Sequence, residues 1–519
     1  MDRKKSKKIR NARIIATNIF MTISVIVIVF VLIFVAQGYT INRSGEFEQS
    51  GLVQIRSNPS GATVRIDGET QFSHTEINKM LRATTHNIII SKDGYDTWRT
   101  DIDVESGLLT RIEWVRLFPL ESKPTDALEF DNLRFATFSN NRKQLLALEY
   151  NSNDLKLVNI QGAQPKITKI ALDSILPTSE DEEPNYDLDF YYWNDTSNHV
   201  ILRQHQAEQA DQWILANLDT PEKSLNLSQK LELNIVQILF ANDAATKFWV
   251  LDDQQNLYSY EISNQNPETP VALAKSVIKI ANNGDTVAYM ANETDEKTGS
   301  TMSNIYILKD GETSSTLIDT IESANDISLA MGTYWGSEWL AYNSGNTAKI
   351  VSGKYPSANK QEKTLSSILK EELSFTPSLN SVNQDQRLVV FADAQHYFTY
   401  DFENKTSDTF ATDSDISQVN WIDDFLLWQK HDTKITVRDF NGQNRRELIS
   451  NINNDMPVII SANNKWLYYF DREVEEVESA ETEPTAETEP SEETEAAETE
   501  ENNQPLKIHF ILKREALQL

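Results

Sequence analysis

The longest apolar stretch of the chain runs from residue 14 to residue 39 and contains no charged side chain. A helix of that length rises about 39 Å at roughly 1.5 Å per residue, which exceeds the ~30 Å hydrocarbon core of a bilayer. A cleaved secretory signal has a shorter apolar core, of roughly 7 to 15 residues. The pattern therefore predicts an uncleaved transmembrane signal-anchor helix at residues 14–39, with the lipid bilayer as its partner.

Basic side chains precede this stretch. Residues 1–13 contain seven Lys or Arg residues and one Asp, a net charge of +6. Lys and Arg next to a spanning helix favour the cytoplasmic side, so we expect a cytoplasmic basic tail, a single crossing and an extracytoplasmic remainder. A polar stalk is expected at residues 40–50. A nuclear or nucleic-acid patch is the other interpretation of the basic cluster, and the adjacent spanning helix disfavours it.

Beyond residue 50 the pattern changes to short alternating or β-branched runs, which are typical of β-strands. Turn signals with Gly, Pro or Asp separate the runs, at residues 58–61, 67–68 and 92–94. A small β-domain is predicted at residues 51–119. Its expected strands are residues 52–55, 62–66, 87–90 and 109–117.

This segment resembles the PEGA domain family in its turn-forming and core β-residues. The matching positions are Pro59, Gly61, Ala62, Asp67, Gly68, Gly94 and Tyr95. Ser60 stands where the family has glutamate, and residues 71–81 lack the family's Gly-x-Thr-Pro turn. The resemblance implies a β-sandwich module outside the membrane of bacteria or archaea, with no catalytic activity.

From residue 129 to residue 519 the chain repeats a loose unit of strand, polar turn, strongly apolar strand, polar turn and strand. Successive units are spaced by about 46 residues, close to the blade length of WD-type and kelch-type propellers. We predict a seven- or eight-bladed β-propeller, with a pair of β-sandwiches as the competing fold. The eight units start at residues 135, 190, 238, 278, 333, 380, 419 and 458.

Some units resemble the degenerate repeats of TolB-like and WD-like propellers, whose mark is a Ser-x-Asp-Gly-like turn before an apolar strand. Residues 139–141, 281–284 and 462–464 hold that place. The resemblance implies the same propeller fold for the large region.

The eighth unit is interrupted by an acidic segment at residues 473–504. It holds fourteen glutamates between Glu473 and Glu501, without Lys, Arg or an aromatic residue. Such a composition buries too little apolar surface to offset the entropy of ordering. We predict a disordered insertion within the last blade, a solvated spacer or alternatively a tether for cations or a basic partner, with residues 506–512 supplying the next strand.

The net charge and the cysteine content exclude several classes of function. The formal net charge is −30, and it becomes −36 when the basic tail is set aside; such a surface repels nucleic acid. The chain has no cysteine, which excludes disulfides, thiolate nucleophiles and sulfur-based metal sites. A large outer region without disulfides favours a bacterial cell envelope.

No common nucleotide, zinc or serine-hydrolase motif is present, so no catalytic, cofactor-binding or metal-ligating residue and no cofactor is expected. The Asp pairs at 252–253 and 423–424 are expected to lie in turns. The seven histidines occur singly and are expected to be structural or exposed: His74, His86, His199, His205, His396, His431 and His509.

Aromatic residues recur near the same strands of successive units. Packing between blades is expected for most of them, while one or two at a propeller mouth would be placed to stack on sugar or peptide. The recurring residues are Tyr191, Tyr192, Trp193, Trp249, Tyr334, Trp335, Trp339, Trp421, Trp428 and Trp466.

These patterns favour a non-catalytic, membrane-anchored binding or scaffolding protein of the cell envelope. Its candidate partners are cell-wall polymer, a peptide or another envelope protein. The alternative is an anchored polysaccharide hydrolase or lyase that uses acidic residues at the propeller opening, by analogy of fold. A sensor that signals through a membrane partner is a third hypothesis.

Overall fold

The chain is described by a computed structural model, in which it forms two compact units, residues 1–121 with 518–519 and residues 122–517. The described residues are 2–41, 45, 47–150, 152–176, 187–205, 210–262, 271–294, 299, 301–322, 327–358, 365–412, 415–475 and 507–518.

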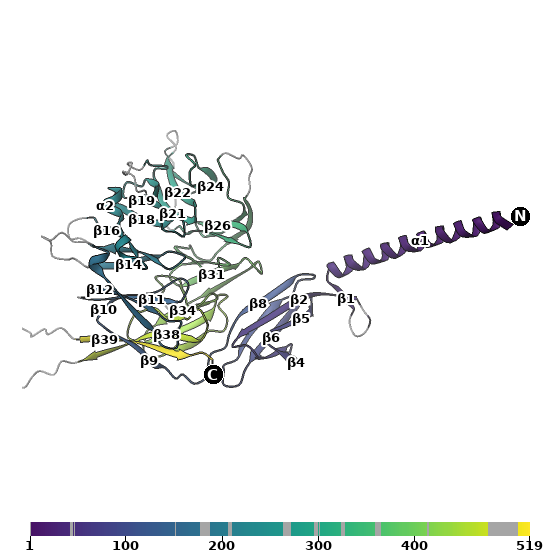
Figure 1. The fold of residues 1–519 in the computed structure, drawn as a ribbon, viewed down its shortest axis with the longest axis horizontal. Coiled ribbons are helices and arrows are strands. Elements are labelled where there is room, and N and C mark those ends of the chain that lie inside the picture. Colours follow the sequence, from purple (N-terminus) through teal and green to yellow (C-terminus); the bar gives the residue numbers. More distant parts are fainter. Residues whose placement is uncertain are drawn as a thin grey trace, which may run out of the picture. The chain divides into compact units, whose positions relative to one another are not determined.

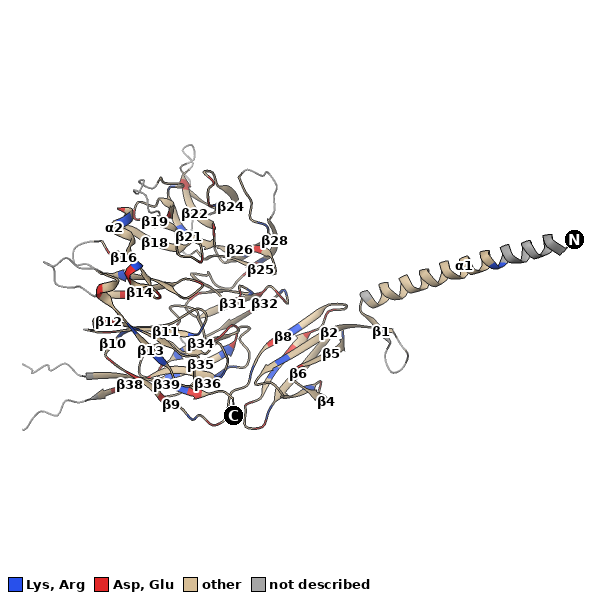
Figure 2. Cartoon of the chain, in the orientation of Figure 1, with Lys and Arg blue, Asp and Glu red and all other residues tan. Residues whose placement is uncertain are grey.

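The first unit begins with helix α1, Asp2–Ala36 (Figure 1). Its segment Arg13–Val35 is the one helix of the described residues that is long and apolar enough to cross a membrane, and its only charged residue is Arg13 at the start (Figure 2). The helix ends three residues before the expected position 39. Gly38 takes a left-handed φ of 78°, which suits glycine and ends the helix.

Two four-stranded sheets form the rest of this unit. In one, β2 pairs with β1, β5 and β8; the other has the order β4-β3-β6-β7. Val53, Ile55, Ile88 and Ile90 are fully buried, as period-2 alternation requires. The strands are β1 (Tyr39–Ile41), β2 (Phe47–Asn58), β3 (Thr63–Ile66), β4 (Glu69–His74), β5 (Ile77–Arg82), β6 (Thr85–Ser91), β7 (Trp98–Asp103) and β8 (Leu109–Arg116).

Two features of this unit differ from the sequence-based expectation. A hairpin replaces most of the stalk expected at residues 40–50, because β1 pairs antiparallel with the start of β2, from Tyr39↔Gln49 to Ile41↔Phe47. Strands β4, β5 and β7 were not predicted. Most side chains of β4 and β5 are exposed, which leaves no alternation to detect, whereas β7 alternates between buried and exposed side chains and was missed.

The second unit consists of eight sheets in the described residues, one for each predicted repeat. Seven sheets follow chain order from the first strand outward, and the third has three strands. These strands are β10 (Leu133–Phe138), β11 (Gln144–Glu149), β12 (Asp154–Asn159) and β13 (Lys166–Ala171); β14 (Leu188–Trp193), β15 (His199–Gln204), β16 (Gln212–Asn217) and β17 (Leu225–Asn226); β18 (Ile235–Phe240), β19 (Lys247–Asp252) and β20 (Leu257–Glu261); β21 (Val277–Asn283), β22 (Thr286–Thr294), β23 (Thr301–Lys309) and β24 (Thr316–Glu322); β25 (Leu329–Tyr334), β26 (Ser337–Ser344), β27 (Thr347–Gly353) and β28 (Leu365–Glu372); β29 (Leu379–Val382), β30 (Leu388–Ala392), β31 (His396–Asp401) and β32 (Thr406–Ala411); β33 (Asn420–Trp421), β34 (Leu426–His431), β35 (Lys434–Asp439) and β36 (Arg446–Ile449).

The eighth sheet joins the two ends of this unit. Its order is β37 (Ile459–Ile460), β38 (Trp466–Glu475), β39 (Lys507–Ala516) and β9 (Thr125–Asp131). The strand predicted beyond the acidic segment is therefore confirmed as β39. Strand β9 begins four residues before the expected propeller start at residue 129 and was missed. The expected boundary at residue 473 falls inside β38, and residues 476–504 of the acidic segment lie outside the described residues.

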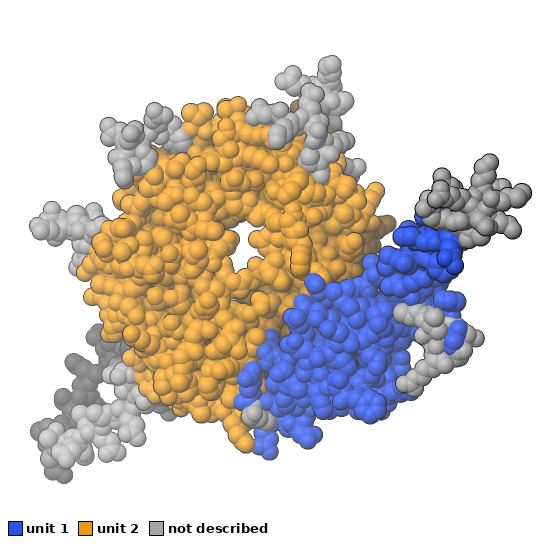
Figure 3. Space-filling view, turned by 45° about the vertical axis from the view of Figure 1, so that its right-hand side comes forward, with its two compact units in different colours: residues 1–121, 518–519 blue, residues 122–517 orange. Residues whose placement is uncertain are grey.

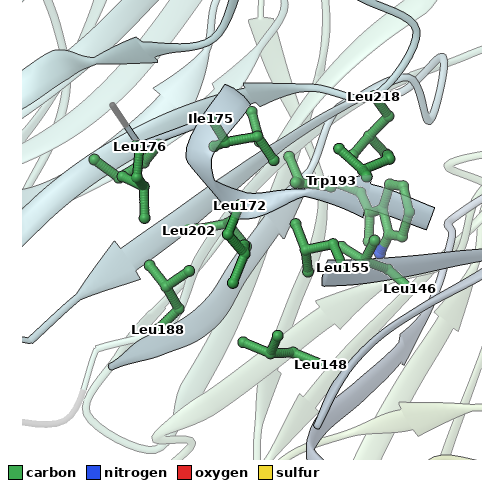
Figure 4. Packing of buried hydrophobic residues seen from close by; sticks show 14 residues of the cluster. Leu146, Leu148, Leu155, Leu172, Ile175, Leu176, Leu188, Trp193, Leu202 and Leu218 are labelled. Atoms are coloured by element: carbon green, nitrogen blue, oxygen red, sulfur yellow. The ribbon is translucent and has the colours of Figure 1, made fainter. Parts of the chain in front are cut away.

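Hydrophobic clusters join neighbouring sheets into a ring around an opening (Figure 3). Between the first and second sheets, Leu146, Leu155, Trp193 and Leu202 belong to one cluster (Figure 4). Another cluster joins the eighth sheet to the first. The predicted fold class, a small β-sandwich and a seven- or eight-bladed propeller with one apolar N-terminal helix, is confirmed, and the described residues form eight sheets. Each sheet is hereafter called a blade.

Short helices occur in the connections of the early blades. They are η1 (Leu172–Ser174), η2 (Pro221–Lys223) and α2 (Leu227–Leu231). Asn226 caps α2, since its side chain accepts a hydrogen bond from the backbone N–H of Gln229.

A buried ion pair stabilises the sixth blade. The Arg387 guanidinium donates from Nε and Nη2 to both carboxylate oxygens of Asp401, at 2.8 and 2.7 Å. The two side chains are 2% and 0% exposed. Asp401 also accepts hydrogen bonds from the Glu403 backbone N–H and from the Asn404 amide, so its oxygens are well satisfied, as a buried carboxylate requires.

Candidate functional site

The first strand of every blade contributes to a cavity at the centre of the ring. The cavity has a volume of about 790 Å³ and is lined by residues of all eight first strands and of the turns that follow five of them. Figure 3 shows the opening in the second unit. We call this space the central cavity.

Polar side chains hold the turns after the first strands. The Asn194 Oδ1 accepts the backbone N–H groups of residues 198 and 199, at 3.0 and 2.9 Å, and Asn383 Oδ1 accepts from Leu388 N at 2.8 Å. The same place is held by Ser139 in the first blade and Ser461 in the eighth. Residues 139–141 and 462–464 are two of the predicted turns before apolar strands, while residues 281–283 of the third predicted turn belong to the end of β21. Each capping side chain fixes where its turn meets the cavity.

The pair Asp423 and Asp424 lies in a turn, as expected, whereas Asp252 is the last residue of β19 and Asp253 begins the turn that follows. Asp423 Oδ1 accepts the backbone N–H groups of Phe425 and Leu426 at 2.9 and 2.8 Å. Asp252 Oδ1 accepts the backbone N–H of Asn256 at 2.7 Å. In both turns the carboxylate is held by the backbone.

Amide side chains bridge neighbouring blades around the cavity. Asn282 Nδ2 donates to the Phe240 carbonyl at 2.7 Å, and Asn380 Nδ2 donates to the Leu329 carbonyl at 3.1 Å. Asn383 Nδ2 reaches the Asp424 carbonyl at 2.8 Å. These three bonds join different blades, so they hold neighbouring parts of the cavity wall together.

Three other amides of the wall, Asn140, Gln384 and Asn420, make no side-chain hydrogen bond to any residue that the structure describes. They come from the first, sixth and seventh blades. Each amide offers one acceptor and two donor hydrogens. The wall therefore presents unsatisfied, uncharged hydrogen-bonding groups to the cavity.

The cavity wall has few charged side chains, and most of them are paired with another charge or hydrogen-bonded to the backbone. Arg142 Nη2 lies 2.6 Å from Asp424 Oδ2, which neutralises both groups. Partial removal from water and the like charge of Asp243 raise the pKa of Asp195. Asp195 is thus the one carboxylate of the described wall that makes neither a hydrogen bond to the backbone nor an ion pair with a cation, and a pair of free carboxylates is not formed.

The recurring aromatic residues divide between the core and the cavity. Trp193, Trp249 and Trp339 are buried and belong to clusters between blades, as expected for most of the set. Tyr192 and Trp421 line the cavity. Adjacent strand residues point to opposite sides, which is why Trp193 enters the core while Tyr192 faces the cavity.

The two cavity aromatics are held in place. The Tyr192 ring stacks on Phe240, with centroids 5.8 Å apart and planes at 25°, and burial followed by the charge of Asp195 raises the pKa of Tyr192 to about 12. The hydroxyl therefore stays protonated at neutral pH. Trp421 Nε1 donates to Ser381 Oγ at 3.0 Å, which fixes the indole orientation.

The seven histidines lie away from the central cavity. Five of them, His86, His205, His396, His431 and His509, lie within 4 Å of a carboxylate oxygen. His86 and His509 lie in strands β6 and β39, as expected. Among the described residues, no group of three or more His, Asp or Glu side chains is placed to hold a metal ion.

His205 is held between two carboxylates at the end of β15. Its Nε2 lies 2.6 Å from Asp189 Oδ2 and its Nδ1 lies 3.2 Å from Asp211 Oδ1. The hydrogen bond to Asp189 raises the pKa of His205. Burial opposes the charged form of Asp189, but the His205 hydrogen bond and the Arg134 charge outweigh it and lower the pKa of that carboxyl.

We expect the stability that His205 contributes to depend on pH. A raised histidine pKa gives stability that is complete below the unfolded value of 6.5 and is lost as pH rises through the folded-state pKa. The His205→Gln variant should therefore lose more melting temperature relative to the wild type at about pH 5.5 than at about pH 8.5. His74→Gln, at an exposed position, is the matched control. An equal loss at both pH values would contradict this assignment.

Comparisons with known proteins identify one domain. Residues 50–115 match the PEGA domain family, which confirms the resemblance seen at residues 51–119. No curated protein matches the chain in sequence.

Several solved structures share a limited likeness with the chain. A prolyl endopeptidase is 10% identical, with a TM-score of 0.41 over 66% of this chain and 52% of that chain. Dipeptidyl peptidase 4 of Porphyromonas gingivalis is 9% identical, with a TM-score of 0.43 over 65% and 56%. The propeller domain of the Trilobed protease from Pyrococcus furiosus is 11% identical, with a TM-score of 0.36 over 63% and 99%. The matches thus span about half of the two peptidases, and they carry no argument about function.

Proposed function

We propose that the protein is a membrane-anchored, extracytoplasmic binding protein, and that the central cavity is its binding site for an uncharged, polar polymer of the cell envelope. The carrying observation is the cavity wall, which combines three unpaired amides with two fixed aromatic rings. Helix α1 supplies the anchor, and the basic tail at residues 1–13 favours a cytoplasmic N-terminus.

The state of the wall carboxylates supports binding over hydrolysis. Glycosidases need two carboxyl groups on either side of the bond that they cleave. Asp423 caps its own turn and Asp424 is paired with Arg142, which leaves Asp195 alone. The amide bridges between blades support a preformed site.

The test is co-sedimentation of the full chain, in lipid nanodiscs, with purified insoluble cell wall. We expect the wild type to pellet with the wall, and the double variant Tyr192→Ala with Trp421→Ala to bind at least about tenfold more weakly, because stacked rings commonly dominate binding. Trp335→Ala is the matched control, since Trp335 is 76% exposed and lies outside the cavity.

Equal pelleting of the wild type and the double variant, or no pelleting of the wild type, would overturn the cavity as the binding site. Melting curves of all three proteins show that a loss of binding is not a loss of fold.

A further inference from the structure

We infer that the ligand of the central cavity is a neutral glycan chain, an inference that rests on the proposed function. Three properties of the wall support this inference. They are its net charge, the hydrogen bonds that its backbone carbonyls already accept, and the position of its unpaired polar side chains relative to its aromatic rings.

The charge of the wall disfavours anionic polymers. Its one guanidinium, on Arg142, is neutralised by Asp424 at 2.6 Å. Asp195 and Asp423 remain, so the wall is net negative, inside a protein of net charge −30. An anionic glycan or a phosphate-bearing polymer meets repulsion and no free cation in the described part of the wall.

The backbone of the wall disfavours an extended peptide. A peptide binds a strand edge through its backbone N–H and C=O groups. The first strands of five successive blades already use a carbonyl to bind a side chain of a neighbouring blade, and three of these carbonyls belong to residues that line the cavity, Phe240, Ile280 and Leu329. The bonds are Arg134 to the Leu188 carbonyl, Asn282 to the Phe240 carbonyl at 2.7 Å, Gln237 to the Ile280 carbonyl at 3.4 Å, Asn380 to the Leu329 carbonyl at 3.1 Å and Ser328 to the Leu379 carbonyl at 3.0 Å.

The unpaired polar side chains of the wall can form hydrogen bonds with sugar hydroxyls. Asn140, Gln384 and Asn420 each donate and accept hydrogen bonds, and a hydroxyl does the same. The Tyr192 hydroxyl has no hydrogen-bond partner among the described residues, and its raised pKa keeps it a donor.

One aromatic ring, that of Tyr192, lies across the cavity from an unpaired amide, whereas Trp421 is next to Asn420 in β33. Tyr192, in the second blade, is four positions from Gln384, in the sixth blade, around a ring of eight, so the two face each other across the cavity. A pyranose has an apolar face and a polar rim. Its face would pack on the Tyr192 ring while its hydroxyls reach the amides opposite.

The test is calorimetric titration of the full chain in nanodiscs with three kinds of probe. The first is a set of neutral tetrasaccharides, built from glucose, mannose or N-acetylglucosamine. The second is tetragalacturonate, which has similar rings with a carboxylate on each. The third is an uncharged, end-capped octapeptide of Asn, Ser and Val. We expect at least one neutral tetrasaccharide to bind, tetragalacturonate to bind at least tenfold more weakly than that sugar, and the peptide not to bind.

Variants assign the polar contacts. Gln384→Met and Asn420→Leu keep the side-chain volume and remove the hydrogen-bonding groups. Each variant should bind the sugar about tenfold more weakly, because losing one good hydrogen bond raises the dissociation constant roughly tenfold. Gln254→Met, at an exposed position outside the cavity, should leave binding unchanged.

The outcomes separate this inference from the proposed function. If the peptide binds and no sugar does, with loss in the Tyr192→Ala variant, the glycan inference falls while the cavity remains a binding site. Equal binding of tetragalacturonate also overturns the inference. If no probe binds and the cell wall does not pellet the protein, both fall.

Discussion

Ending the chain after residue 506 is expected to prevent the propeller from folding. This truncation removes β39, which pairs with β38 from Trp466↔Ala516 to Glu475↔Lys507 and with β9 on its other edge. It also removes the buried side chains Phe510 and Leu512. Each buried side chain of this size contributes about 1.5 to 3 kcal/mol, and the partners Phe130 and Phe470 are exposed with them. The combined loss is comparable to the roughly 5 to 15 kcal/mol that keeps a domain folded.

The measurement is near-ultraviolet circular dichroism and limited proteolysis of the truncated chain in nanodiscs. We expect loss of the fixed aromatic signal and rapid cleavage within residues 122–475. A protease-resistant propeller after truncation would show that seven blades and a partial eighth are sufficient.

The matched control removes residues 476–506 and joins the two strands by Asn-Gly. Glu475 and Lys507 are register partners, so a two-residue turn spans the gap. We expect a folded propeller whose stability is unchanged or greater by about 2 kcal/mol, because a shorter loop costs less closure entropy. Unfolding of this variant would mean that the excised residues themselves support the blade.

The Arg387→Met variant is expected to lose about 3 to 5 kcal/mol of unfolding free energy, which is the usual cost of leaving one charge of a buried pair without its partner. Asp401 is fully buried and would keep only hydrogen bonds from residues 403 and 404. Burial, followed by the charge of Asp401, raises the pKa of the neighbouring Asp408 to about 6, so removing the guanidinium leaves the Asp401 charge without its cation and close to a second carboxyl group. Urea unfolding followed by tryptophan fluorescence measures the change.

Two further variants control for this effect. The double variant Arg387→Met with Asp401→Leu should recover part of the loss, because no unpaired charge remains buried. Lys434→Met breaks an exposed pair with Glu447, in which the side chains are 51% and 43% exposed, and should cost less than about 1 kcal/mol. If Arg387→Met lowered the free energy of unfolding no more than Lys434→Met does, the buried pair would contribute no more to stability than an exposed pair.

The amino-acid pattern predicts the repeating part of the fold well. Apolar second strands such as β11 and β30, each after a capped turn, give a signal that each blade repeats. Strand β9 gives no such signal, because Phe130 is its one fully buried residue. Its role depends on meeting β39, at a sequence separation that no local pattern reveals.

The central cavity could be foreseen only in part. The recurrence of aromatic residues indicated packing between blades, and one or two rings at the mouth. Which residues face the opening depends on how the eight blades are arranged around it. Tyr192 and Trp193 are neighbours in sequence, yet Tyr192 lines the cavity and Trp193 packs between blades. The unpaired state of Asn420 follows from what the other blades do, and sequence does not contain it locally.

The pairing of β9 with β39 also sets the order in which the molecule can be completed. Thr125 and Arg514, which are hydrogen-bonded, are 389 residues apart. At a synthesis rate of roughly 5 to 20 residues per second, β9 waits about 20 to 80 s for its partner strand. By the end of that interval the strands of the first seven blades have been synthesised, while β9 still lacks its partner. Pairing of β39 with β9 is therefore among the last events in the folding of this protein. A quality-control protease that reaches the chain earlier meets an incomplete eighth blade, with the edge of β9 unpaired.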